Sequence, residues 1–330
     1  IRETSWANIR DRLAVGHFDV AHMLAPMPIA ASLNLTSLAV PMLAPMVLGL
    51  GGNAITVAAS IWRQMADLGA DPDGDPASTG VAFAKVLSAR KERGESRLRF
   101  GVVHPFSGHA YELRYWLAAA GLDPDLDVEI SVVPPQLMAD ALAAGQLDGY
   151  CVGEPWNTAA VQAGTGRIAT FKQAIWPDSP EKVLGVTRKW AKAQPDTLFA
   201  LMRAISAAAD WCAQSDHLTE LAQLLAGPKY IDCSLDLCVP ALGGDMKLGQ
   251  NTHKSIPDFL TFSGGLSAAP SPAQGVWFFS QMVRWGQAVA DPEAERQAAE
   301  IFAPDLYEDA LGIGPIGEPQ TIRLFDMSEV

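Results

Sequence analysis

The chain has 330 residues, of which 49% are apolar and 18% are charged, a composition typical of a globular protein. This length is sufficient for two lobes with separate hydrophobic cores. The formal net charge of -13 predicts an acidic surface that repels phosphate backbones, so we expect no direct binding to nucleic acid. The longest apolar stretch, roughly residues 35–59, is interrupted by Pro41, Pro45 and several glycines, which argues against a transmembrane span.

The spacing of apolar residues predicts helices that alternate with strands along the first two thirds of the chain. We expect helices over 6–15, 26–33, 60–68, 81–93, 110–120 and 136–144, and strands over 18–22, 98–103, 127–133, 150–152 and 183–187, with a further strand from Val47. From Pro195 onward the pattern is mainly helical, with helices over 197–213, 218–225 and 274–288. Residues 70–80 are predicted to form a loop and residues 312–330 an extended tail. Alternating strands and helices indicate an α/β fold with mainly parallel sheets.

The chain begins close to its first predicted helix, and no strand precedes that helix. A sheet normally begins with a strand, so we expect the natural protein to have additional residues upstream. The absence of a leader peptide here is therefore uninformative about the compartment.

One local pattern occurs twice, at residues 12–22 and 141–151. In both copies an amphipathic helix ends at a glycine, Gly16 or Gly145, and Asp19 or Asp148 follows within three residues. Glycine suits the left-handed residue after a helix, and aspartate suits a tight turn. A short strand then leads into a loop that contains proline. Ligands bind at such strand ends in open α/β sheets, so we expect two similar units whose ligand edges face each other across a cleft.

The four cysteines, Cys151, Cys212, Cys233 and Cys238, form no C-x-x-C pair, and no histidine cluster has metal-ligand spacing. We therefore predict no metal site and no cofactor. Cys233 and Cys238 could pair in an oxidising compartment, although reduced structural thiols are the favoured alternative. Cys151 has apolar neighbours, which favours an inert buried thiol over a nucleophile. The chain also contains neither a phosphate-binding loop nor a nucleophile elbow, so we predict that it is not an enzyme.

Several stretches resemble the nitrate/bicarbonate-binding solute-binding proteins, which are of the periplasmic-binding-protein type. The most specific is Gly-Tyr-Cys-Val-Gly-Glu-Pro-Trp within residues 148–157, and the others are Ser-Trp-Ala-Asn-Ile-Arg-Asp (5–11), Ala-His-Met-Leu-Ala-Pro-Met-Pro (21–28), Gly-Asn-Ala-Ile-Thr-Val (52–57), His-Ala-Tyr-Glu-Leu-Arg-Tyr-Trp-Leu-Ala (109–118), Glu-Lys-Val-Leu-Gly (181–185) and Gln-Met-Val-Arg-Trp-Gly (281–286). They cover nearly the whole chain in the family's order.

The resemblance implies a type II periplasmic-binding-protein fold, in which two lobes close over a small oxyanion in an interlobe cleft. We expect lobe one to comprise residues 1–97 and 185–330, and lobe two residues 98–184, with hinges at the two crossings. Similar proteins serve either as the receptor of a nitrate or bicarbonate ABC importer, or as a nitrate/nitrite sensor that controls an RNA-binding antiterminator. The partner is accordingly an ABC permease or an antiterminator protein, and the location is periplasmic or membrane-associated in the first case and cytoplasmic in the second.

Five residues are the candidate ligands of the anion, on the basis of the resemblance. Trp6 matches a cleft tryptophan and could stack on the anion or donate its indole N–H, with a hydrophobic plug as the alternative. Asn53 would donate its amide, with a turn asparagine as the alternative. His109 lies near a predicted helix start, which favours an anion, although a polar cap is the ordinary role there; His104 and Ser107 are weaker candidates.

Gly153 could direct its backbone N–H at the ligand, whereas Glu154 beside it is interpreted as structural, bonding loop amides or a partner in the other lobe. Lys182 would select a permanent anion, because bicarbonate-preferring relatives carry an acidic residue there that pairs with a metal ion. A solvated lysine is the alternative. The sequence therefore predicts nitrate or nitrite binding, with bicarbonate binding or an enzyme of the thiamine-precursor type as the alternatives.

Overall fold

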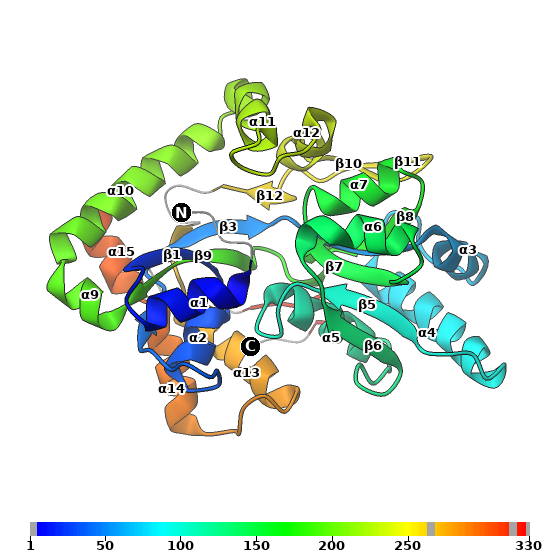
Figure 1. Cartoon of the computed structure of the whole chain (residues 1–330), viewed down its shortest axis with the longest axis horizontal. Helices are drawn as coiled ribbons and strands as arrows, with labels where there is room; N and C mark the ends of the chain where they lie inside the picture. Colours follow the sequence, from blue (N-terminus) through cyan, green and yellow to red (C-terminus); the bar gives the residue numbers. More distant parts are fainter. Residues whose placement is uncertain (1–4, 263–267, 317–321, 328–330) are drawn as a thin grey trace.

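A computed structural model describes residues 5–262, 268–316 and 322–327 and contains two five-stranded sheets, the first antiparallel and the second mixed, each covered by helices (Figure 1). The first sheet has the order β1 (Val20–Leu24), β9 (Pro180–Thr187), β3 (Val47–Gly51) and β12 (Leu260–Thr261), and β2 (Met42–Leu43) also pairs with β9. The second sheet has the order β6 (Val128–Val132), β5 (Leu98–Val102), β7 (Gly149–Gly153), β4 (Asn53–Ala58) and β8 (Gly166–Phe171). Among the described helices, none combines the length and apolar character that crossing a membrane requires.

The α/β class is confirmed, but the prediction of mainly parallel sheets is wrong. Within the part of the chain that the structure describes, the paired strands are parallel only where β5 meets β6 and β7. Strand β4 runs antiparallel to both β7 and β8, and β9 runs antiparallel to β1, β2 and β3. The reason is that β4 and β9 are the strands by which the chain passes between the two sheets, so each enters its sheet in the reverse direction.

The chain crosses between the two sheets at positions other than residues 97 and 184, where the lobe boundaries are predicted. Strand β4 follows β3 directly and belongs to the second sheet, and helices α3 (Ala59–Asp67) and α4 (Pro76–Glu92) pack with it. The first crossing is therefore at Gly51–Gly52, and the second runs through α8 (Lys172–Ile175) into β9. The hairpin of β10 (Asp245–Gly249) and β11 (Thr252–Ser255) also contacts the second-sheet side through α7 (Trp156–Gln162) and β8.

The repeated turn is confirmed in both copies. Gly16 follows α1 (Trp6–Ala14) with a φ of +75°, and Gly145 follows α6 (Met138–Ala143) with a φ of +67°. A left-handed conformation of this kind favours glycine over residues with a side chain. Strands β1 and β7 begin shortly after these turns, and the Asp148 carboxylate accepts a hydrogen bond from the backbone N–H of Arg99 in β5.

The boundaries of many predicted elements shift by a few residues, and two larger differences concern the predicted loop and the predicted tail. Helix α4 begins at Pro76, inside the predicted loop 70–80, because Asp75 caps it by accepting a hydrogen bond from the N–H of Ser78. Of the predicted tail over 312–330, residues 313–316 belong to no helix or strand, and residues 317–321 and 328–330 lie outside the described residues. The remaining helices are α2 (Met27–Ser32), α9 (Arg188–Ala193), α10 (Pro195–Cys212), α11 (Leu218–Ala226), α12 (Leu235–Gly243), α13 (Pro272–Arg284), α14 (Pro292–Ile301) and α15 (Pro304–Leu311).

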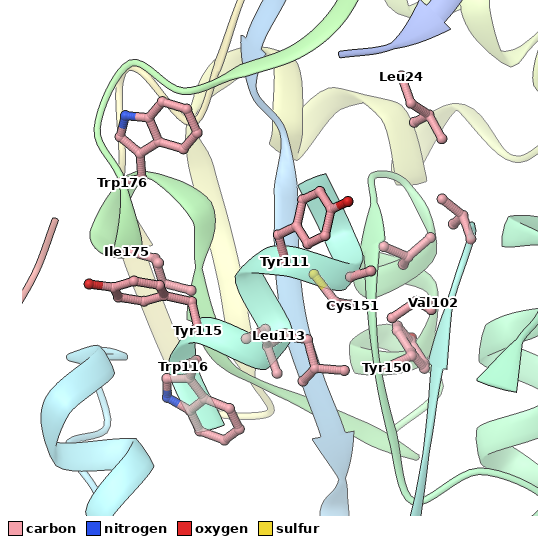
Figure 2. Close-up of a cluster of buried hydrophobic side chains, with 14 of the residues drawn as sticks. Leu24, Val102, Tyr111, Leu113, Tyr115, Trp116, Tyr150, Cys151, Ile175 and Trp176 are labelled. Carbon is pink, nitrogen blue, oxygen red and sulfur yellow. The ribbon is translucent and has the colours of Figure 1, made fainter. Parts of the chain in front are cut away.

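Helix α5 (Gly108–Ala119) is anchored in the hydrophobic core along its whole length. Figure 2 shows four of its side chains, Tyr111, Leu113, Tyr115 and Trp116, together with Tyr150 and Cys151 of β7 and the aromatic ring of Trp176. Trp176 in turn packs on Trp277 of α13, with ring centroids 4.2 Å apart. The first turn of α5, which carries His109 and Glu112, is therefore held in a fixed position.

Candidate anion-binding site

The five residues predicted to bind the anion come from five separate elements and form one chain of contacts where the two sheets meet. Trp6 opens α1, Asn53 opens β4, His109 lies in the first turn of α5, Gly153 closes β7, and Lys182 lies in β9. Gly153 pairs with Asn53 across the second sheet, and a Cβ atom on Gly153 would lie 3.9 Å from His109 Nε2. Glu181 lies between His109 and Lys182, and the Lys182 Nζ atom lies over the Trp6 ring.

Lys182 has more contact with solvent than its neighbours His109 and Glu181. Its side chain is 20% exposed, whereas those of His109 and Glu181 are 3% and 5% exposed. The Nζ atom forms an ion pair with Glu181 Oε1 and lies 5.3 Å from the centroid of the Trp6 ring. The ammonium group that is predicted to select the anion is therefore already paired with a neighbouring carboxylate.

Glu181 is the central residue of the cluster. Its Oε1 atom lies 3.4 Å from His109 Nε2, and its Oε2 atom accepts from Lys172 Nζ at 3.2 Å and from Asn53 Nδ2 at 2.9 Å. Burial alone would raise the pKa of this carboxyl, but His109, Lys182 and Lys172 together hold it well below its usual range. Glu181 is therefore ionised at neutral pH.

Two further buried charges, Glu112 and Lys172, were missed by the sequence analysis. Their side chains are 2% and 0% exposed, and Lys172 Nζ lies 2.5 Å from Glu112 Oε1. Lys172 also bonds the backbone carbonyl of Pro180 at 3.3 Å. The one signal in the sequence was the spacing of His109 and Glu112, which places both on one face of a helix. Nothing local indicated that Lys172, 60 positions further on, would pair with Glu112.

Asn53 and His109 are deeply buried, and their hydrogen-bonding capacity is partly used within the protein. The Asn53 Nδ2 group donates to Glu112 Oε2 at 3.2 Å and to Glu181 Oε2 at 2.9 Å, so both of its hydrogens serve carboxylates. Burial lowers the pKa of His109 to about 3, with Glu181 opposing and Lys182 and Lys172 reinforcing this shift. At neutral pH the imidazole is therefore uncharged and has one N–H to donate.

Glu112, Glu181, Lys172 and Lys182 form an ionic cluster. Gly108 leaves room for it, because the backbone there comes close to the charged groups. A Cβ atom on Gly108 would lie 2.9 Å from Glu181 Oε2, 3.0 Å from Glu112 Oε1 and 3.1 Å from Lys172 Nζ. A side chain at this position would thus displace the three charged groups. The resulting cluster contains two carboxylates and two ammonium groups, whose charges sum to zero around a neutral histidine.

The weaker candidates have structural roles in this site. The Ser107 hydroxyl caps α5 by accepting from the N–H of Ala110 at 3.1 Å, and it donates to the His104 carbonyl at 2.6 Å. His104 Nδ1 accepts from the N–H of Phe106 at 3.1 Å. Glu154 accepts from the N–H of Thr158 at 3.0 Å, which agrees with its interpretation as a residue that bonds loop amides.

A pocket of about 860 Å³ opens beside Trp6, on the side of the first sheet that faces α9 and α10. Its walls are mainly apolar side chains, among them Phe18, Leu184 and Trp190. This volume far exceeds that of a small oxyanion, and the residues that line the pocket include no lysine or arginine. The site for an anion is therefore better sought at the Lys182 ammonium and the His109 imidazole than in this pocket.

Residues 1–226 match the NMT1-like family, and the chain belongs to this family. It is 30% identical over 99% of its length to the nitrate/nitrite binding protein NrtA of Synechococcus elongatus, of which it covers 72%. It is 36% identical over 87% of its length to the bicarbonate transport ATP-binding protein CmpC of Synechocystis sp., of which it covers 41%. The chain spans less than half the length of the ATP-binding relatives that it matches, with coverage of 48% and 41%.

A solved structure extends this similarity to the whole fold. The periplasmic nitrate-binding protein NrtA from Synechocystis PCC 6803 superposes with a TM-score of 0.87 at 25% identity, covering 100% of this chain and 86% of that one. The predicted periplasmic-binding-protein fold is thereby confirmed.

Proposed function

We propose that this chain binds nitrate or nitrite between two lobes and serves as the solute-binding component of an ABC import system. Each lobe is one sheet with its helices, and the hinges are the crossings at Gly51–Gly52 and through α8. The anion contacts Lys182 from the first lobe and His109 from the second, with Trp6, Asn53 and Gly153 completing the site. Since both lobes contribute, ligand binding favours the closed form, which a permease would recognise.

The observation that carries this proposal is the position of Lys182 within a fold that superposes on a nitrate-binding protein over its entire length. The lysine head is the partly exposed positive charge of the cluster, beside an aromatic face and an uncharged imidazole. A charge-assisted hydrogen bond from an ammonium to an oxyanion is stronger than one between neutral groups. The relative CmpC is a transport protein by name, which favours import over sensing.

Binding is favoured over catalysis by the state of Cys151. This thiol is buried, and burial followed by the charges of Glu112 and Glu181 raises its pKa well above the usual range. The protonated form is a poor nucleophile, so the chain lacks the reactive cysteine that an enzyme of the thiamine-precursor type would need there.

Titration calorimetry with nitrate, nitrite and bicarbonate tests the proposal. We expect saturable binding of nitrate or nitrite without any requirement for calcium. Bicarbonate binding that depends on calcium would instead support the second candidate, which the similarity to CmpC favours. A protein that binds none of the three anions would disprove the assignment of the site.

Replacing Trp6 by alanine should weaken nitrate binding by about 0.5–2 kcal/mol, because a cation–π interaction with the indole face helps to position the Lys182 ammonium. This corresponds to a rise of about 2- to 30-fold in Kd, measurable by the same titration. Trp6→Phe retains a ring face, so its Kd for nitrate should lie between those of the unmodified protein and Trp6→Ala. If Trp6→Ala binds nitrate as tightly as the unmodified protein, Trp6 is a packing residue only.

A further inference from the structure

The ionic cluster is electrically neutral before any ligand binds, so it offers no excess positive charge to an incoming anion. In the ion pairs that the structure contains, Glu112 and Glu181 are counted as two negative charges and Lys172 and Lys182 as two positive charges, and His109 is uncharged at neutral pH. An anion at Lys182 and His109 therefore adds an uncompensated negative charge to a largely buried site. Buried charges are normally paired, and a nearby ionisable group takes up or releases a proton to avoid the imbalance.

The two carboxylates of the cluster differ in how well their charges are compensated. Glu181 faces the ammonium groups of Lys172 and Lys182. It also faces His109 Nε2 and the Asn53 amide. Glu112 faces the single ammonium of Lys172, which it shares with Glu181, together with the Asn53 amide and the weak thiol donor of Cys151 at 4.0 Å. The shared amide nitrogen lies 3.2 Å from one carboxylate and 2.9 Å from the other, so the two carboxylates are close neighbours.

We propose that Glu112 is the proton acceptor of the anion site: when an oxyanion binds at Lys182 and His109, solvent supplies one proton to the Glu112 carboxylate, and the cluster stays neutral. This inference rests on the proposed function and adds a binding-site residue that contacts the anion only through its neighbours. Glu112 thereby acts as a positioning and charge-compensating residue.

The surroundings of Glu112 favour it over the other groups as the acceptor. Burial raises its pKa and the charge of Glu181 adds to this, while Lys172 and Asn53 oppose the shift. His109 would have to be charged against a pKa of about 3, and the pKa of Glu181 is held low. The groups that face Glu112 are Asn53 of β4, Cys151 of β7, Lys172 of α8 and Glu181 of β9, and His109 lies three residues before it on the same helix. An anion near them raises the pKa of Glu112 further.

The proton can be counted by nitrate titration calorimetry near neutral pH in two buffers of different ionisation enthalpy. Nitrate itself does not titrate in this range, so any uptake belongs to the protein. We expect uptake approaching about one proton per nitrate, and an association constant that falls by up to about tenfold for each pH unit above neutrality. Glu112→Gln should bind nitrate without proton uptake and with a flat pH profile.

Glu154→Gln is the matched control, because Glu154 is also a buried carboxyl and burial raises its pKa to about 7. Proton uptake should persist in that variant. Infrared difference spectra of the unmodified protein provide a second readout: nitrate should generate the C=O band of a protonated carboxylic acid, so the test remains available if Glu112→Gln does not fold. Nitrate binding without proton uptake, or uptake that survives in Glu112→Gln, would overturn this inference alone, whereas absence of nitrate binding would overturn the proposed function as well.

Discussion

Replacing Lys172 by methionine should destabilise the folded protein by about 3–5 kcal/mol, the range measured when one partner of a buried ion pair is removed. Lys172 is fully buried and contacts Glu112 at 2.5 Å and Glu181 at 3.2 Å. Without its ammonium, Glu112 has no positive partner among the described residues. The free energy of unfolding from urea denaturation would show this loss. The loss should be largest at neutral pH and smaller in acid, because protonation of Glu112, whose pKa is already raised by burial, removes the unpaired charge.

The matched control for this variant is Arg97→Met, which breaks the exposed ion pair of Arg97 with Glu129. These side chains are 47% and 51% exposed and lie 3.2 Å apart, and such a pair contributes about 0–1 kcal/mol. The double variant Lys172→Met/Glu112→Gln should recover part of the stability, since only Glu181 then remains charged beside Lys182. A loss in Lys172→Met no larger than that in Arg97→Met would show that the buried cluster does not stabilise the fold.

Replacing Lys182 by methionine should reduce nitrate affinity by about 1.5–3 kcal/mol, which is the contribution of one hydrogen bond to a charged group, or about 10- to 150-fold in Kd. The effect on stability should be smaller than for Lys172→Met, because Glu181 keeps Lys172 and His109 as partners. Calorimetry measures the first quantity and urea denaturation the second. Lys182→Glu should go further and abolish binding, because it places a second carboxylate beside Glu181.

Lys189→Met controls for the general loss of a positive charge. Lys189 is an exposed residue of α9, seven positions along the chain from Lys182, and its removal should leave both affinity and stability within error. If Lys182→Met retains full nitrate affinity, the anion must bind elsewhere, and the apolar pocket beside Trp6 would become the next site to test.

Much of the secondary structure could be predicted, because it depends on local patterns. The two glycine turns at Gly16 and Gly145 have the left-handed conformation that glycine alone adopts easily, and helix α5 follows the apolar spacing of its residues. The direction of β4 and β9 could not be predicted in this way. Both strands are buried along nearly their whole length, and a strand buried on both faces shows no alternation that would reveal its direction, so only its neighbours in the sheet decide it.

The sequence by itself determined the α/β class, the turn glycines and the residue types of the site, including the motif that contains Glu181 and Lys182. The tertiary structure decided what those residues contact. Lys182 is paired with a carboxylate, the Asn53 amide serves two carboxylates, and Lys172 and Glu112, from α8 and α5, meet in the interior. Such pairs depend on burial and on contacts between distant segments. The same lysine and glutamate on a surface would be solvated and nearly independent of each other.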